Sequence, residues 1–166
     1  MENELFRCIK LIDKNKLTQE DKEELLRMFM ITKNDLVRNQ LAFIFSDLKF
    51  DRAVPYILKK INEKSLSHNN GSLVFSLEPF DLSKYFIQLI KIICEHEYEP
   101  RLWAYGFVED LSPKISKAVL KKGLTILEDR RIRLEEGAAD SGENSSLHFV
   151  EQTEKMLLKH LTPKSG

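Results

Sequence analysis

The sequence predicts an all-α protein built from repeated helical hairpins, and three observations lead to this prediction. Apolar residues recur at the three- and four-residue spacing of an amphipathic helix along almost the whole chain. The alternation of apolar and polar residues that is typical of strands is nowhere convincing. A short phrase, FSDLKFD at residues 45–51, recurs as FSLEPFD at residues 75–81.

Composition is typical of a single soluble domain. The chain has 166 residues, of which 42% are hydrophobic, and this is enough for one domain with a core. Its 26 basic and 26 acidic residues balance, so no long-range field attracts nucleic acid or an anionic membrane. The first ten residues lack the apolar stretch of a signal peptide, and no segment is apolar enough to span a membrane. We therefore expect a soluble, cytoplasmic protein.

The two cysteines, Cys8 and Cys94, each stand beside isoleucine on an apolar helical face. A single disulfide is one interpretation, but two buried thiols in a reducing compartment fit the pattern better. The sequence assigns neither cysteine a role.

Helix signals divide the N-terminal half into two hairpins, at 1–31 and 34–64. Thr18 followed by Asp21 is close to a capping box and opens a helix. Asp51 is placed to cap the second helix of the next hairpin. The predicted apolar stripes comprise Leu5, Cys8, Ile9 and Ile12; Leu25, Leu26, Phe29 and Met30; Val37, Leu41, Ile44, Phe45 and Leu48; and Val54, Ile57, Leu58 and Ile61.

Helix signals in the C-terminal half predict two further hairpins, at 71–95 and 98–135. Ser112 and Pro113 indicate a cap and a first-turn proline that open a long helix towards Glu136. Small and acidic residues at 136–146 indicate a flexible loop. Residues 147–161 return to helical spacing, and we expect this terminal helix to cap an array of helices rather than to pair with another subunit.

The recurring phrase sits where one helix ends and the next begins. Its copies align residue by residue, and a weaker third copy in FVEDLSPKI follows about two periods after the first. The period is roughly thirty residues, or one helical hairpin, as in an α-solenoid. A lone hairpin buries too little apolar surface to offset its ordering entropy, which favours stacked copies. The alternative is chance recurrence of short apolar words in an ordinary helical bundle.

The stretch RNQLAFIFSDLKFDRAVPYILKKI resembles a HEAT-type repeat. NNGSLVFSLEPFD, which follows it, resembles small bacterial HEAT-repeat proteins, some of which are similar to immunity proteins of polymorphic or contact-dependent growth inhibition toxin systems. The resemblance covers about residues 34–127, and SKAVLKKG departs from it because it lacks the Val-Pro pair. It implies a HEAT-like α-solenoid of about four helical hairpins with a C-terminal capping helix.

What the resemblance implies about function is stoichiometric inhibition. Such a protein binds a cognate toxin and covers its active site without performing chemistry. A HEAT-type scaffold or regulatory adaptor is the alternative, and a nucleic-acid-binding HEAT-like protein is the third interpretation.

Catalytic patterns are absent from the sequence. The four histidines are scattered, and no Gly-rich phosphate loop, CxxC pair or nucleophile elbow occurs. EHEYE at residues 95–99 offers ligands for a divalent ion, but successive helical residues point in different directions, which favours a solvated helix end. We predict no enzyme activity, no cofactor and no metal.

Charged candidates for partner binding lie in two places. Lys114, Lys117 and Lys121 fall on one face of the predicted long helix, where they form either a solvated stripe or a patch for an acidic partner. Arginines and stacking aromatics are missing from this stripe, which disfavours nucleic acid. Carboxylate candidates are Glu78, Asp81 and Glu99, although Asp81 also suits a helix cap.

Aromatic candidates for partner binding are Trp103 and Tyr105. Both cannot share a buried face with Ala104 and Phe107, and we expect Tyr105 to be the exposed one. Phe45 and Phe75 occupy matching repeat positions and are both predicted to lie in the core.

Overall fold

The computed structural model describes residues 2–63, 70–137, 142 and 145–162. All regular structure in these residues is helical, which confirms the predicted all-α class. The chain folds as two compact units, Met1–Phe80 and Asp81–Gly166. The boundary between them falls inside the predicted hairpin at 71–95.

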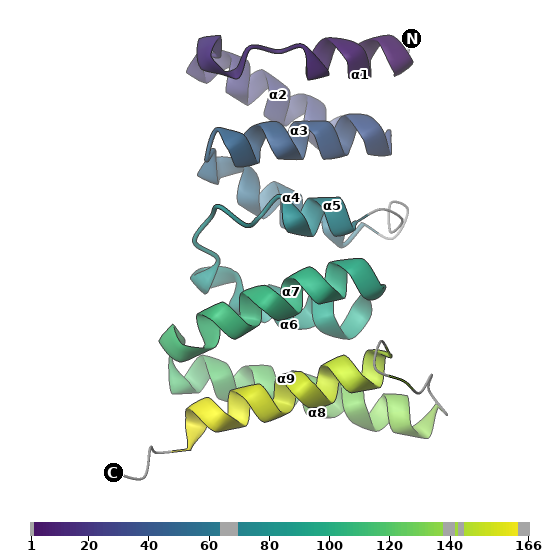
Figure 1. Ribbon diagram of the computed structural model, residues 1–166, viewed down its shortest axis with the longest axis vertical. Coiled ribbons are helices and arrows are strands. Elements are labelled where there is room, and N and C mark those ends of the chain that lie inside the picture. The colour runs from purple at the N-terminus through teal and green to yellow at the C-terminus, as the bar shows by residue number, and fades with distance from the viewer. Residues whose placement is uncertain (1, 64–69, 138–141, 143–144, 163–166) are drawn as a thin grey trace. The chain divides into compact units, whose positions relative to one another are not determined.

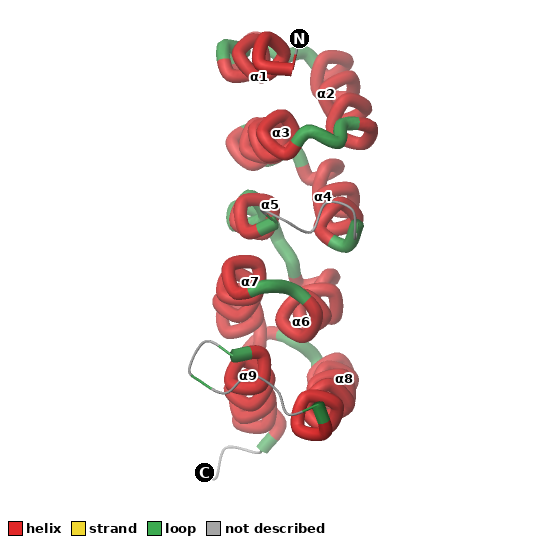
Figure 2. Tube along the Cα trace, turned by 90° about the vertical axis from the view of Figure 1, so that its right-hand side faces the viewer, coloured by secondary structure: helices red, strands yellow, loops and turns green. Residues whose placement is uncertain are grey.

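The first unit contains five α-helices in the described residues. Helices α1, α3 and α5 form one layer and α2 and α4 form the other (Figure 2). Their bounds are α1 Glu2–Lys10, α2 Gln19–Ile31, α3 Asp35–Asp47, α4 Val54–Ile61 and α5 Gly71–Phe75.

Side-chain caps begin α2 and α3 of the first unit, and the sequence predicts the first of these. The Thr18 hydroxyl accepts a hydrogen bond from the Asp21 amide at 3.2 Å, and the Asp21 carboxylate accepts one from the Thr18 amide at 2.8 Å. Hydrogen bonds from Thr18 lower the pKa of Asp21, and they confirm the capping box before α2. Asn34 caps α3, where its side chain accepts a hydrogen bond from the Val37 amide at 3.0 Å.

The core of the first unit joins α2, α3 and α4. Phe29 and Phe45 are fully buried and meet edge to face, with ring centroids 5.7 Å apart. Leu41 of α3 and Ile57 of α4 are fully buried as well. The predicted stripes of these three helices therefore supply the core, except that Met30 is 45% exposed and Leu48 lies just beyond α3 and is half-buried.

Three predictions for the first unit are wrong. Phe75 is 41% exposed, because α5 has only five residues and Phe75 ends it. Cys8 is exposed, as is Leu5 of the same predicted stripe, because α1 buries Ile9 and ends at Lys10, before Ile12. Asp51 caps no α-helix, because a 3-10 turn at Asp51–Ala53 precedes α4 and no side chain caps α4.

The second unit contains four α-helices in the described residues. In Figure 2, α7 and α9 form one layer and α6 and α8 form the other, and α7 lies in front of α6 in Figure 1. Their bounds are α6 Phe86–Glu95, α7 Tyr98–Leu111, α8 Lys117–Glu136 and α9 Ser146–Leu161.

The core of the second unit lies between its two layers. Leu89 and Ile90 of α6, Leu127 of α8 and Val150 of α9 are all fully buried. Gly123 lets α8 approach its neighbours closely, since an added Cβ would lie 3.2 Å from a methyl carbon of Leu157 and 3.6 Å from a side-chain carbon of Ile90. The terminal helix is confirmed and begins one residue earlier than predicted.

The predicted start of the long helix is wrong, and part of the predicted loop after it lies outside the described residues. The long helix begins after Ser116, which accepts a hydrogen bond from the Val119 amide, and not after Ser112. Ser112 is buried and donates to the Val108 carbonyl, while Pro113 belongs to a 3-10 turn. Of the predicted loop at 136–146, residues 138–141 and 143–144 lie outside the described part of the chain.

Buried cations occupy matching places in the two units. Arg38 and Arg101 are each the fourth residue of their helices, α3 and α7, and are 0% and 6% exposed. Arg101 donates from Nε to the Ile93 carbonyl at 3.1 Å and from a terminal nitrogen to the Ser146 hydroxyl at 2.6 Å. Positive charge at a helix C-terminus is favourable, so Arg101 secures the end of α6 against α7 and α9.

Candidate protein-binding surface

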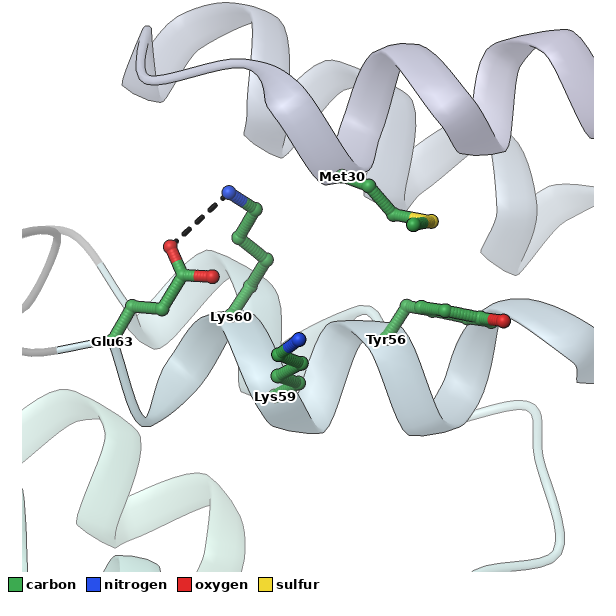
Figure 3. Close-up of a pocket in the computed structure, with 5 residues that line it drawn as sticks. All are labelled: Met30, Tyr56, Lys59, Lys60 and Glu63. Atoms are coloured by element: carbon green, nitrogen blue, oxygen red, sulfur yellow. Dashed lines mark hydrogen bonds and ion pairs between the residues drawn. The ribbon is translucent and has the colours of Figure 1, made fainter.

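The first unit has a small pocket between α2 and α4. It has a volume of about 80 Å³ and is lined by Met30, Tyr56, Lys59, Lys60 and Glu63 (Figure 3). Lys60 points towards Glu63, with 3.1 Å between the ammonium nitrogen and a carboxylate oxygen, whereas Tyr56 points away along α4.

The Lys60 ammonium has a structural role in this pocket. The side chain is 6% exposed and also donates to the carbonyl of Thr32, the residue that ends α2, at 3.2 Å. Burial lowers the pKa of Arg38, and the charges of Asp35 and Glu63 oppose this shift. These interactions compensate the charges of two buried cations, Lys60 and Arg38. They do not place a nucleophile beside a base, as covalent catalysis would require.

Neither a metal-ligand cluster nor a membrane-spanning helix occurs in the described residues. No group of three or more His, Cys, Asp or Glu side chains in this part of the chain is arranged to hold a metal ion. Among the same residues, no helix is both long enough and apolar enough to cross a bilayer.

One face of α7 combines exposed apolar and acidic side chains. The opposite face buries Pro100, Arg101, Ala104 and Val108 against the unit. Helical spacing places on the outer face a set that we call the α7 surface, comprising Glu99, Leu102, Trp103, Gly106, Glu109 and Asp110.

The centre of the α7 surface is apolar. Leu102 is 42% exposed and Trp103 is 40% exposed. Exposed tryptophan is a frequent anchor of protein interfaces, because its large ring releases much water when a partner covers it. An adjacent leucine extends the apolar area.

The three carboxylates of the α7 surface form no hydrogen bond or ion pair with other described side chains. Some acidic residues elsewhere are paired with cations: Glu154 contacts Arg131 at 3.1 Å, and Asp47 pairs with Lys14. Glu99, Glu109 and Asp110 therefore present negative charge that no described cation neutralises. Such charge attracts basic groups of a partner.

Gly106 lies in the middle of this face. A Cβ atom built on Gly106 would meet nothing within 4 Å. A glycine inside a helix costs about 1 kcal/mol relative to alanine, and here no neighbouring atom requires it. The helix backbone is therefore open to close approach between the flanking side chains.

The structure reverses the expected exposure of the two aromatic candidates on α7. Trp103 is exposed, whereas Tyr105 is half-buried and meets Phe149 of α9 edge to face, with ring centroids 5.7 Å apart. Burial, followed by the charge of Glu109, raises the pKa of Tyr105. Tyr105 is turned by about 200° from Trp103 around the helix, which directs it towards α9.

The predicted acidic turn residues are exposed. Glu78 lies in a turn, two residues before Phe80 ends the first unit. Asp81 accepts a hydrogen bond from the Ser83 amide at 3.0 Å, at the start of the 3-10 turn before α6. Hydrogen bonds from Ser83, and then the charges of Lys84 and Lys114, lower the pKa of Asp81.

The predicted lysine stripe is shorter in the structure. Lys117 and Lys121 lie one turn apart on α8 and are exposed. Lys114 is exposed too, but it belongs to the 3-10 turn at Ser112–Lys114 and does not continue the stripe. Its prediction as a residue of the long helix is wrong, because that helix begins later.

Sequence reasoning selected Glu99 and Trp103 but missed the rest of the α7 surface. The missing members are Leu102, Gly106, Glu109 and Asp110. Leu102 follows Glu99 by three residues, Gly106 follows Trp103 by three, and Glu109 and Asp110 follow Gly106 by three and four, so the helical spacing is visible in the sequence. The outer face became recognisable only once Ala104 and Val108 were known to mark the buried one.

Comparisons with protein-family models, curated proteins and solved structures found no match.

Proposed function

We propose that this protein acts by binding a basic protein partner through the α7 surface. The observation that carries the proposal is the exposed Leu102–Trp103 pair beside three carboxylates that no described cation neutralises. Burial of the apolar centre by a partner supplies binding affinity, and the surrounding carboxylates orient a basic partner and speed its association.

The architecture proposed for the chain is a HEAT-like α-solenoid. Within each unit, helices that follow one another alternate between two layers (Figure 2). The matching buried arginines, Arg38 and Arg101, support a repeated structural unit. Repeat folds expose long helical faces, which suits recognition of a macromolecule.

The proposed partner is a bacterial toxin, which the chain would neutralise as an immunity protein. The resemblance of residues 34–127 to HEAT-type immunity proteins supports this proposal. Toxins that cut nucleic acid bind phosphates with basic residues, and the carboxylates of the α7 surface suit such a site. Occlusion of the site would inhibit the toxin without chemistry by this chain.

The test is co-expression with the toxin encoded by an adjacent open reading frame. We expect the two chains to co-purify as a 1:1 complex and toxin activity to fall to zero at equimolar inhibitor. Failure to form the complex contradicts the immunity role. A complex that leaves the toxin active assigns the chain to the adaptor class instead.

Charge reversal tests whether the α7 surface makes the contact. Glu99→Lys combined with Asp110→Lys should raise the Kd by about tenfold or more and leave the thermal midpoint unchanged. Glu136→Lys, at the exposed end of α8, is the matched control and should bind normally. Glu78→Lys, tested separately, shows whether the turn near Phe80 contributes. Unchanged affinity in the double variant contradicts the assignment of the surface.

A further inference from the structure

Gly106 is the least expected residue of the α7 surface. It lies near the middle of a 14-residue helix and adopts ordinary helical geometry, since its φ is not positive. Apart from its two chain neighbours and the nearby backbone of its own helix, no described atom lies within 4 Å of the position that its Cβ would take. Neither close packing nor a positive φ angle therefore explains why this position is a glycine. A residue that lowers helix propensity without a structural reason points to a role in function.

The residues around Gly106 define what would approach it. Trp103 precedes it by about one turn and Asp110 follows by about one turn, so the two are about 10 Å apart along the helix axis. Glu109 flanks the same gap. A side chain lying over Gly106 would have an indole on one side and carboxylates on the other.

We propose that Gly106 is the floor of a site for an arginine side chain of the partner. The guanidinium stacks on aromatic faces and binds carboxylates with two parallel hydrogen bonds, and an ammonium matches this geometry less well. Trp103 supplies the ring, Glu109 and Asp110 supply the carboxylates, and the missing Cβ lets the arginine lie close to the helix. This inference rests on the proposed binding function and names the partner group that the surface recognises.

The fluorescence of Trp103 provides a direct measurement, because it is the only tryptophan of the chain. The probes are three 15-residue alanine-based peptides that carry arginine, lysine or glutamate at every fourth position. We expect the arginine peptide to change Trp103 emission saturably, the lysine peptide to bind about tenfold more weakly, and the glutamate peptide to have no effect. Equal responses to arginine and lysine would overturn the arginine assignment.

Gly106→Gln tests the floor of the site. Glutamine is a good helix former, so we expect the thermal midpoint to rise by about 2–4 °C, while arginine-peptide affinity, read by anisotropy of a labelled peptide, falls about tenfold or more. Thr125→Gln places the same side chain on the exposed part of α8, in the other layer of the unit, and should leave affinity unchanged (Figure 2).

Other outcomes reject the site or the function separately. Unchanged affinity in Gly106→Gln overturns the site. A shift of Trp103 emission with protein concentration and no peptide assigns the surface to a second copy of this chain, and also overturns it. If the protein binds the arginine peptide but not the toxin, the immunity role is rejected and the arginine site is retained. If the protein binds the toxin and Gly106→Gln does not weaken that binding, only the arginine site is rejected.

Discussion

Cys8 and Cys94 place the same residue type in opposite environments. Cys94 is buried in α6, and burial raises the pKa of its thiol from the ordinary 9.0 to about 12. Nearby Arg130 opposes this shift, which desolvation nevertheless dominates. Cys8 is exposed on α1. A thiolate is the reactive form of cysteine, so exposure and pKa together determine which residue reacts.

Thiol labelling at pH 8 checks this difference. We expect 5,5′-dithiobis(2-nitrobenzoate) to modify one thiol per native chain rapidly and the second only after unfolding in urea. Cys8→Ser should remove the fast reaction, and Cys94→Ser should preserve it. Equal rapid reaction of both thiols would contradict the buried position of Cys94.

The same pKa shift makes stability depend on pH in the alkaline range. The folded-state pKa of Cys94 lies above the unfolded value, so its contribution to stability is complete below about pH 9 and is lost as pH rises towards 12. We expect the free energy of unfolding of the wild type to decline more steeply over this window than that of Cys94→Ala. Parallel declines would show that the thiol is not the responsible group.

Helices α7 and α8 each contain a glycine within the helix, and the two glycines have different surroundings. Gly106 on α7 has open space beside it, whereas Gly123 on α8 is buried against Leu157, Ile90 and Phe86. Both lower the helical propensity of their segments. Only Gly123 gains a compensating close contact between helices, which explains its place in the fold.

Alanine substitutions at the two glycines should therefore change stability in opposite directions. Gly106→Ala is expected to raise the free energy of unfolding by about 1 kcal/mol. Gly123→Ala is expected to lower it by about 1 kcal/mol, because overpacking against fully buried Leu157 exceeds the gain in propensity. Urea denaturation measures both. A gain in both variants would show that α8 can move to accommodate a methyl group.

The whole molecule comprises two compact units, each with its own core. Phe29, Phe45 and Ile57 are buried in the unit Met1–Phe80, and Leu89, Leu127 and Val150 are buried in the unit Asp81–Gly166. Trp103 belongs to the second unit, so its fluorescence reports on that unit, whereas far-UV circular dichroism reports on the helices of both. Repeat proteins can unfold in parts, since their stability is a sum over units and their neighbours.

Phe45→Ala tests whether the two cores unfold separately. Truncation of a fully buried phenylalanine costs about 3–5 kcal/mol. We expect it to move part of the circular dichroism transition to lower urea concentration and to leave the midpoint of Trp103 fluorescence unchanged. Leu127→Ala is the matched variant in the second unit and should move the Trp103 midpoint. Equal shifts of both signals in Phe45→Ala would contradict separate unfolding.

Local sequence signals predicted the helices well. The pair Thr18 and Asp21 begins α2 as expected, and the apolar residues predicted within α3 and α4 are among their buried residues. These features depend on interactions within about one helical turn. Errors at Asp51 and Ser112 arose because each begins a 3-10 turn, which has similar composition to a cap but delays the α-helix by three or more residues.

The α7 surface was predicted only in part. Glu99 and Trp103 were selected as single residues, and Tyr105 was expected outside although it packs on Phe149. An unbroken run of apolar or small residues from Leu102 to Val108 leaves the buried side of this helix ambiguous in the sequence. The position of α9 decides it, and α9 lies far along the chain.

The amino-acid sequence by itself determined the helical class, the capping box of α2 and most of the apolar stripes of α2, α3 and α4, because each depends on neighbours within a few residues. Only the tertiary structure decided the exposure of Phe75, Cys8 and Trp103 and the open position of Gly106 among the side chains of the α7 surface. Exposure depends on which distant helix covers a side chain, and periodicity along one helix contains no such information.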